Sequence, residues 1–201
     1  MRTQVLIIHG GTTFDNKKQY LEYLESQTID INRIKPGYDW KVTLQDNLGK
    51  NYEVLSPKMP NNTYAQYNEW KLWFENLLTV VNKDLILIGH SLGGIFLAKY
   101  LSEHLIDNNI LSLLLIAAPF KSNPNETLGS FELKKQLYNI TKQTKNISLV
   151  HSQDDPVVPY NDALLYEKEL PGAKLISFKD KQHFNQQLFP ELSDIIKKMP
   201  K

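Results

Sequence analysis

Six short apolar runs alternate with segments of helical periodicity along this chain, and this alternation constrains its fold more than any other feature. The runs lie at Gln4 to Ile8, Tyr52 to Leu55, Asp84 to Ile88, Leu111 to Ala117, Ile147 to His151 and Lys174 to Phe178. Continuous apolar runs of this length suit strands that are buried on both faces. Strands that alternate with helices predict a three-layer α/β/α sandwich around a mostly parallel sheet of about six strands.

Helical periodicity places helices between these runs. We expect them at residues 63–81, where tryptophan and leucine side chains recur at helical spacing, after Ser91, around Leu133 to Ile140, at 162–170 and at 184–199. The long segment between the first two runs predicts two or three short helices. Its part from Trp40 to Leu48 fits one helix face capped by Gly49, although a hairpin that turns at residues 47–50 is the alternative.

The composition is that of an ordinary globular chain. With 201 residues, 41% of them apolar, we expect a single domain over residues 1–201 without a large lid. A net charge of +1 with interspersed signs indicates neither a nucleic-acid nor a membrane partner, and nothing indicates a protein partner. The N-terminus has no signal-peptide pattern, no window is long enough to span a membrane, and cysteine is absent, so we expect a cytoplasmic protein.

The third apolar run leads into Gly-His-Ser-Leu-Gly, and a helical pattern follows directly. A Gly-x-Ser-x-Gly string between a strand and a helix is typical of a nucleophile elbow, in which a sharp turn lifts the serine hydroxyl to the carboxyl edge of the sheet. The string alone arises by chance, but the flanking strand and helix patterns favour the functional interpretation. Ser91 is therefore the candidate nucleophile.

A serine hydroxyl needs a base to take its proton and a group to orient that base. His183 lies in the loop between the last apolar run and the final helix, where a base is expected, whereas the other four histidines do not match the order Ser, Asp, His. The fifth run is followed by Asp154 and Asp155, and either is a candidate for the orienting acid. Both aspartates could instead only cap the turn that follows.

The oxyanion that forms during acyl transfer requires backbone N–H donors. One is expected from Leu92, directly after the nucleophile, and the other from the glycine-rich loop after the first run, with Gly11 as candidate and Thr12 as the alternative. That loop lacks a G-x-G-x-x-G pattern and a P-loop lysine, which disfavours a nucleotide. No histidines or acids have metal-ligand spacing, so we expect neither cofactor nor metal.

With the segments IIHGG, GHSLGG, DDPVVP and KQHF in place, the chain resembles the α/β-hydrolase superfamily and, within it, the small serine hydrolases of the retinoblastoma-binding protein 9 type. The resemblance covers nearly the whole length. It implies Ser91 as nucleophile, Asp155 as acid, His183 as base, and Leu92 with the loop at Gly11 as oxyanion donors. Gln182 stands where relatives usually carry glycine.

These residues predict a serine hydrolase of the carboxylesterase type, acting on small or short-acyl esters or amides through an acyl-enzyme intermediate. The roughly thirty residues between the fourth and fifth runs leave no room for the large lid of lipases. The alternatives are a protein-binding module on a hydrolase scaffold with little activity, and an acyltransferase that uses an acceptor other than water.

Overall fold

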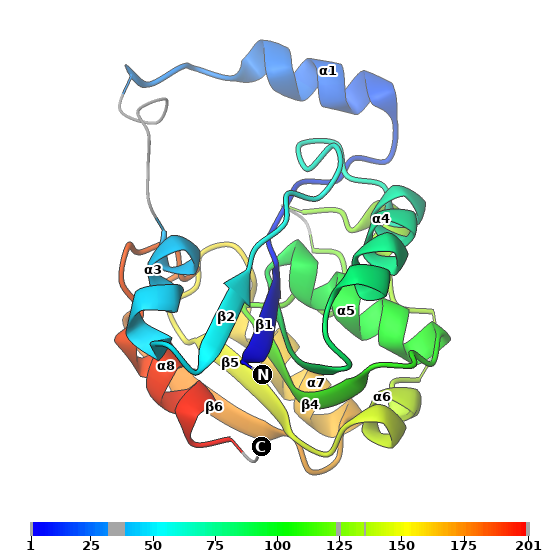
Figure 1. Cartoon of the computed structure of the whole chain (residues 1–201). Helices are drawn as coiled ribbons and strands as arrows, with labels where there is room; N and C mark the ends of the chain where they lie inside the picture. The colour runs from blue at the N-terminus through cyan, green and yellow to red at the C-terminus, as the bar shows by residue number, and fades with distance from the viewer. Residues whose placement is uncertain (1, 32–38, 124–125, 135, 200–201) are drawn as a thin grey trace.

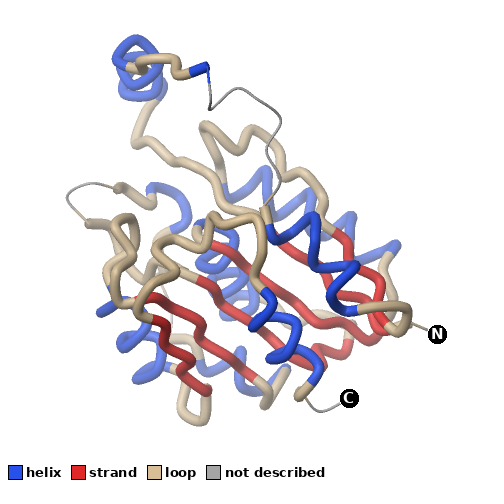
Figure 2. The backbone as a smooth tube through the Cα atoms, turned by 90° about the vertical axis from the view of Figure 1, so that its left-hand side faces the viewer, coloured by secondary structure: helices blue, strands red, loops and turns tan. Residues whose placement is uncertain are grey.

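The computed structural model describes residues 2–31, 39–123, 126–134 and 136–199. Six parallel strands form one sheet in the spatial order β2-β1-β3-β4-β5-β6 (Figures 1 and 2). Their bounds are β1 Thr3–Ile8, β2 Tyr52–Leu55, β3 Asp84–His90, β4 Asn109–Ile116, β5 Ile147–Ser152 and β6 Lys174–Phe178. Each strand overlaps one predicted run, so the predicted parallel sheet is confirmed.

Helices cover both faces of this sheet, which confirms the three-layer arrangement. Their bounds are α1 Lys17–Ser26, α3 Trp40–Leu48, α4 Tyr67–Val80, α5 Leu92–Glu103, α6 Tyr138–Gln143, α7 Tyr160–Glu169 and α8 Pro190–Lys197, with a 3₁₀ turn η1 at Gly129–Phe131. Alternate residues of β1 separate the two cores: Leu6 and Ile8 pack with α4 to α7, whereas Val5 and Ile7 pack with α3 and α8.

The segment between β1 and β2 contains the predicted helix from Trp40 to Leu48, and the hairpin alternative is wrong. Asp39 caps α3 by accepting the Lys41 N–H at 2.9 Å, and Gly49 ends the helix with a φ of 80°. The strand that follows pairs in parallel with β1. The rest of the expected helical region includes α1, while residues 32–38 lie outside the described part of the chain.

Three helices begin later than the periodicity predicts. The helix expected from Leu133 begins at Tyr138. The helix expected from residue 63 begins at Tyr67, because the preceding turn is tied to the loop after β1 by bonds from the Thr12 N–H to the Asn62 carbonyl and from the Ala65 N–H to the Thr12 carbonyl. The helix expected from residue 184 begins only at Pro190, since Phe184 has a left-handed φ of 54°. The aromatic side chains of Phe184 and Phe189 are buried in the irregular loop that precedes this helix.

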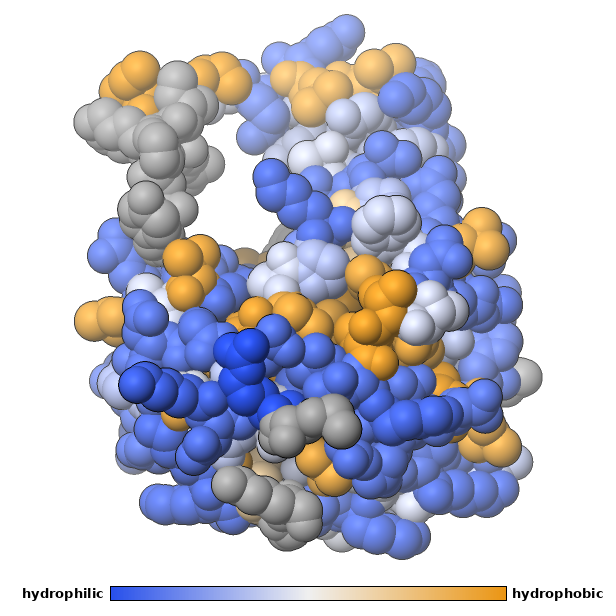
Figure 3. Space-filling view, in the orientation of Figure 1, coloured by the Kyte–Doolittle hydropathy of each residue, from blue (hydrophilic) through white to orange (hydrophobic). Residues whose placement is uncertain are grey.

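Helix α1 stands away from the sheet, beyond its carboxyl edge (Figure 1). None of the residues of α1 is buried, and apolar side chains in and after this helix, such as Leu24, Ile29 and Ile31, are exposed (Figure 3). Its contact with the body runs through rings, with Tyr20 stacked on Tyr64 at 5.0 Å and beside Phe14 at 5.5 Å. Among the described residues, no helix is long and apolar enough to cross a membrane.

Candidate active site

Ser91 occupies the sharp turn between β3 and α5. Its φ of 54° and ψ of −124° lie in a region that residues with a side chain rarely adopt. The Ser91 N–H donates to the Ile116 carbonyl on β4 at 2.9 Å, and the side chain makes no capping bond to α5. The hydroxyl therefore stands at the carboxyl edge of the sheet and is free to bond with a neighbouring base.

Glycines permit this turn because α5 crosses directly over the strand ends. A Cβ on Gly93 would lie 2.1 Å from the Ile8 carbonyl oxygen, and one on Gly89 would lie 2.5 Å from the Gly93 carbonyl oxygen. A Cβ on Gly94 would lie 2.5 Å from the Ala118 Cβ. These distances are far below van der Waals contact, so glycine is required for steric reasons at all three positions.

The structure brings Ser91, His183 and Asp155 into one chain of hydrogen bonds. His183 Nε2 lies 2.9 Å from Ser91 Oγ, and His183 Nδ1 lies 2.9 Å from Asp155 Oδ2. The Asp155 side chain is fully buried, and the backbone N–H groups of Val157 and Val158 donate to its Oδ1 at 2.8 and 3.0 Å. Since these residues follow β3, β6 and β5, the parallel sheet delivers all three to the same edge.

Asp154, the other candidate acid, faces a different partner. Its Oδ1 accepts hydrogen bonds from the Ser152 hydroxyl at 2.5 Å and from the Gln182 N–H at 2.9 Å. The hydrogen bonds from the Ser152 hydroxyl and the Gln182 N–H lower the pKa of the Asp154 carboxyl. Asp155 therefore contacts the His183 ring, while Asp154 holds the backbone one residue before it.

The loop that carries His183 has an unusual backbone. Gln182 has a φ of 46° and Phe184 a φ of 54°, both in the left-handed region that favours glycine. Gln182 thus adopts, with a side chain, a conformation that glycine reaches without strain. Phe184 is fully buried and packs against the rings of Phe178 and Phe189, which anchors the loop to the core.

Leu92 and Gly11, the two residues expected to supply the oxyanion donors, lie against one another in the structure. The Leu92 N–H lies at the first turn of α5, where no acidic side chain competes for it. Gly11 lies against this helix, because a Cβ there would come 3.2 Å from Leu92 Cδ2 and 2.7 Å from the Asn62 carbonyl oxygen. The Thr12 N–H already donates to the Asn62 carbonyl at 2.8 Å. Of the two candidates in this loop, Thr12 is therefore occupied.

His9 fixes the peptide that precedes Gly11. The Met59 N–H donates to His9 Nε2 at 2.8 Å, so the ring proton resides on Nδ1, which donates to the Gly10 carbonyl at 2.6 Å. Burial lowers the pKa of the His9 imidazole, which agrees with a neutral ring. The ring thereby connects the Gly10–Gly11 peptide to the segment after β2.

The other three histidines differ in their distance from the site. His104 lies at the far end of α5, with its ring 4.9 Å from that of Tyr100. His151 is buried, bonds to the Val158 carbonyl at 3.0 Å and lies 3.7 Å from Asp155 Oδ2. The His90 ring bonds to the backbone carbonyl of His183 at 2.9 Å, a contact that no local sequence signal indicates. In the described residues no group of three His, Asp or Glu side chains is arranged to hold a metal ion.

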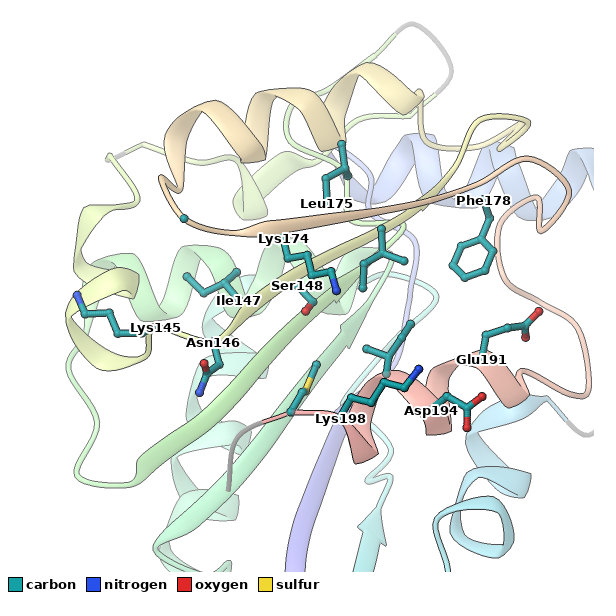
Figure 4. A pocket seen from close by; sticks show the side chains of 14 residues that line it. Lys145, Asn146, Ile147, Ser148, Lys174, Leu175, Phe178, Glu191, Asp194 and Lys198 are labelled. Carbon is teal, nitrogen blue, oxygen red and sulfur yellow. The ribbon is translucent and has the colours of Figure 1, made fainter.

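Two hollows differ in their relation to this site. A groove of about 620 Å³ lies between α8 and the strands β5 and β6, with Leu175, Lys174 and Lys198 among its lining residues (Figure 4), and none of its lining residues belongs to the Ser91 site. A second hollow of about 620 Å³ is lined by His183 itself together with residues of the acid turn and the loop before α8. Only the second hollow adjoins the reactive side chains.

The sheet, with a serine at the turn after β3, defines an α/β-hydrolase fold. The ydeN gene product of B. subtilis superposes with a TM-score of 0.76 over 97% of both chains at 19% identity. Est1E from Butyrivibrio proteoclasticus does so with a TM-score of 0.60 over 98% of this chain and 86% of its own, at 16% identity.

The sequence then identifies the family. The profile of the serine hydrolase family matches residues 34–191, and the chain belongs to that family. It is 29% identical to serine hydrolase RBBP9 of Rattus norvegicus over 151 residues, which are 74% of this chain and 78% of the rat protein. The resemblance inferred from the motifs is confirmed, and the protein is a hydrolase.

Proposed function

We propose that this hydrolase cleaves small or short-acyl carboxylic esters through an acyl-enzyme intermediate on Ser91. The observation that carries the proposal is the continuous chain of hydrogen bonds from Ser91 through His183 to Asp155. Such a chain supplies the base and the orienting acid that a serine hydroxyl needs at neutral pH.

The proposed reaction proceeds in two steps. His183 Nε2 takes the Ser91 proton as Oγ attacks the ester carbonyl carbon, and the carboxylate of Asp155 stabilises the imidazolium. The Leu92 and Gly11 N–H groups bind the oxyanion, and the imidazolium then protonates the departing alkoxide. In the second step His183 deprotonates a water molecule that attacks the acyl carbonyl carbon, and the imidazolium then protonates Ser91 Oγ as the acid leaves.

The expectation of short acyl groups rests on the connection between β4 and β5. Its described residues form only η1 and α6, and Phe131 and Ile140 from these two elements are fully buried in the core. The described residues of this connection therefore pack against the core and form no separate lid domain. A substrate approaches Ser91 from the open carboxyl edge, beside the hollow that adjoins His183.

Fluorophosphonate labelling together with a series of p-nitrophenyl esters tests the proposal. We expect labelling of Ser91, located by mass spectrometry, and a kcat/KM that falls from acetate or butyrate to long-chain esters. Ser91→Ala is expected to lose both labelling and turnover. Full ester turnover by folded Ser91→Ala, or the absence of labelling and turnover in folded wild-type protein, would contradict the proposal.

A further inference from the structure

The loop that carries His183 is held by side chains from three distant parts of the chain. Trp40 at the start of α3 donates its indole N–H to the Phe184 carbonyl at 2.8 Å. His90, beside the nucleophile, donates its Nε2–H to the His183 carbonyl at 2.9 Å. From the far side, Asp154 accepts the Gln182 N–H at 2.9 Å. Consecutive backbone groups on both sides of the base are therefore bonded to side chains.

This loop needs such support because its own conformation is unfavourable. Left-handed φ angles at non-glycine residues cost free energy and persist where the surroundings over-determine them, and here Gln182 and Phe184 flank His183 on both sides with this conformation. If either residue relaxed toward an ordinary φ, the His183 ring would swing relative to Ser91. A loop-borne base thus depends on external bonds for its position.

The two donor side chains are buried in the core and pack against each other. Trp40 is almost fully buried, and its ring lies edge-on to His90 with centroids 6.0 Å apart. The His90 ring in turn lies 5.2 Å from that of His183. Burial holds the pKa of His90 well below its usual value, with Lys41, His183 and His9 adding to the decrease. The ring is therefore neutral and keeps the Nε2 proton that it donates.

We propose that Trp40 and His90 form a clamp that positions His183 for proton transfer to and from Ser91. The proposal rests on the function proposed above, in which His183 is the base. Trp40 and His90 are positioning residues, because neither touches the reacting atoms. Helix α3 extends the clamp through its backbone, since the Trp40 N–H donates to the Gln186 carbonyl at 3.1 Å.

Three variants test the clamp by kinetics. Trp40→Phe keeps an aromatic ring but removes the indole donor. His90→Leu removes the other donor and has a similar volume. Each variant is expected to lower kcat roughly tenfold to a hundredfold while KM stays within about twofold, as small misplacements of catalytic groups do. His90→Gln, whose amide N–H is able to donate to the same carbonyl, is expected to recover much of the loss. The double variant should lose less than the product of the single losses, because both donors hold one loop.

A matched control separates positioning from general destabilisation. Ile140→Ala creates a cavity under α6, in the core on the other face of the sheet, and is expected to lower stability while kcat stays close to that of the wild type. The clamp is disproved if Trp40→Phe and His90→Leu have the kcat of an active wild-type enzyme. It is also disproved if Ile140→Ala lowers kcat as much as they do for the same loss in free energy of unfolding.

A readout independent of turnover distinguishes failure of the clamp from failure of the proposed function. In wild-type protein the His183 Nδ1–H bonded to Asp155 should give a sharp downfield proton resonance, and Trp40→Phe should broaden or shift it while Ile140→Ala leaves it in place. An inactive wild-type protein with this pattern would contradict the proposed function and support the clamp. An unchanged resonance in Trp40→Phe would overturn the clamp whatever the activity.

Discussion

Asp154 accepts the backbone N–H of Gln182 at 2.9 Å, one residue away from the point where the neighbouring Asp155 meets the ring of His183. Two adjacent carboxylates thus serve one histidine in different ways. Asp155 orients the ring directly, and Asp154 holds the backbone that carries it. Their replacement should have different consequences.

Asp155→Asn should reduce kcat by about 10³ to 10⁴, because an amide does not stabilise the imidazolium and favours the wrong tautomer. Asp154→Asn keeps an acceptor oxygen for the Gln182 N–H, so we expect a loss of no more than about tenfold. Steady-state kinetics with a short-acyl ester measures both. Equal losses in the two variants would contradict the division of roles.

Gly93→Ala should prevent or severely impair folding, because its Cβ would fall 2.1 Å from the Ile8 carbonyl oxygen and 2.6 Å from that of His9. Gly172, with a φ of 91° and open space around it, provides the matched comparison. There alanine should cost about 1–2 kcal/mol, from the left-handed conformation alone. Urea unfolding measures the difference, and equal destabilisation would show that the elbow relaxes more readily than its contacts suggest.

His9→Phe should lower kcat by at least about tenfold while KM changes little. The replacement removes both the acceptor for the Met59 N–H and the donor to the Gly10 carbonyl, so the peptide that carries the Gly11 N–H loses its support. Loss of a single oxyanion donor costs about 10² to 10³ in kcat, which sets the upper end. Affinity for a boronic acid, which forms a tetrahedral adduct with serine, should weaken in parallel. An unchanged boronate affinity would assign His9 to packing alone.

Acid should destabilise the protein as the pH falls below about 6.5, the ordinary pKa of histidine. Burial lowers the pKa of His9, His90 and His151. Below about pH 6.5 the unfolded chain therefore binds protons at these rings that the folded state does not bind. The free energy of unfolding decreases from that pH down to each lowered pKa. Three such groups give up to roughly 4 kcal/mol per pH unit. Glu126 and Asp162, whose pKa burial raises, act with the opposite sign nearer to the ordinary range of carboxyls.

Urea unfolding at pH 7.5, 6.5 and 5.5 measures this dependence. His151→Gln should remove about one third of the slope, so the stability that this variant loses relative to the wild type should become smaller as the pH falls. A free energy of unfolding that does not change over this range would show that the folded state admits protons at these rings.

Gln182→Gly should leave the free energy of unfolding unchanged or raise it by up to about 1 kcal/mol, since glycine adopts a φ of 46° without strain. Gln182→Val should destabilise by more than about 1 kcal/mol, because a β-branched side chain tolerates this region poorly. Thermal unfolding checks both variants. Equal behaviour would mean that the loop changes its backbone conformation freely.

Much of the fold was accessible from local pattern. The four central runs became strands because a parallel sheet covered on both faces buries nearly every residue of such a strand, and these runs are visible without any tertiary information. The edge strands β2 and β6 are less buried. The order of the strands was not accessible, since nothing local states which strands pair. The start of α8 was also mispredicted, because Phe184 and Phe189 are buried in an irregular loop ahead of Pro190 and not in a helix.

Ser91 could be identified from adjacent residues, because the elbow requires glycines at fixed spacing. Position before the final helix indicated His183, whereas the choice of Asp155 over Asp154 rested on the resemblance to a known family. The sequence could not decide whether Thr12 is a free donor, since its N–H is occupied by Asn62 from another loop. Nor could it indicate the bonds of His90 and Trp40 to the loop of His183, which join residues 93 and 144 positions apart. Local sequence specifies which groups react, and long-range packing specifies how they are held, because a strained loop takes its shape from the residues that surround it.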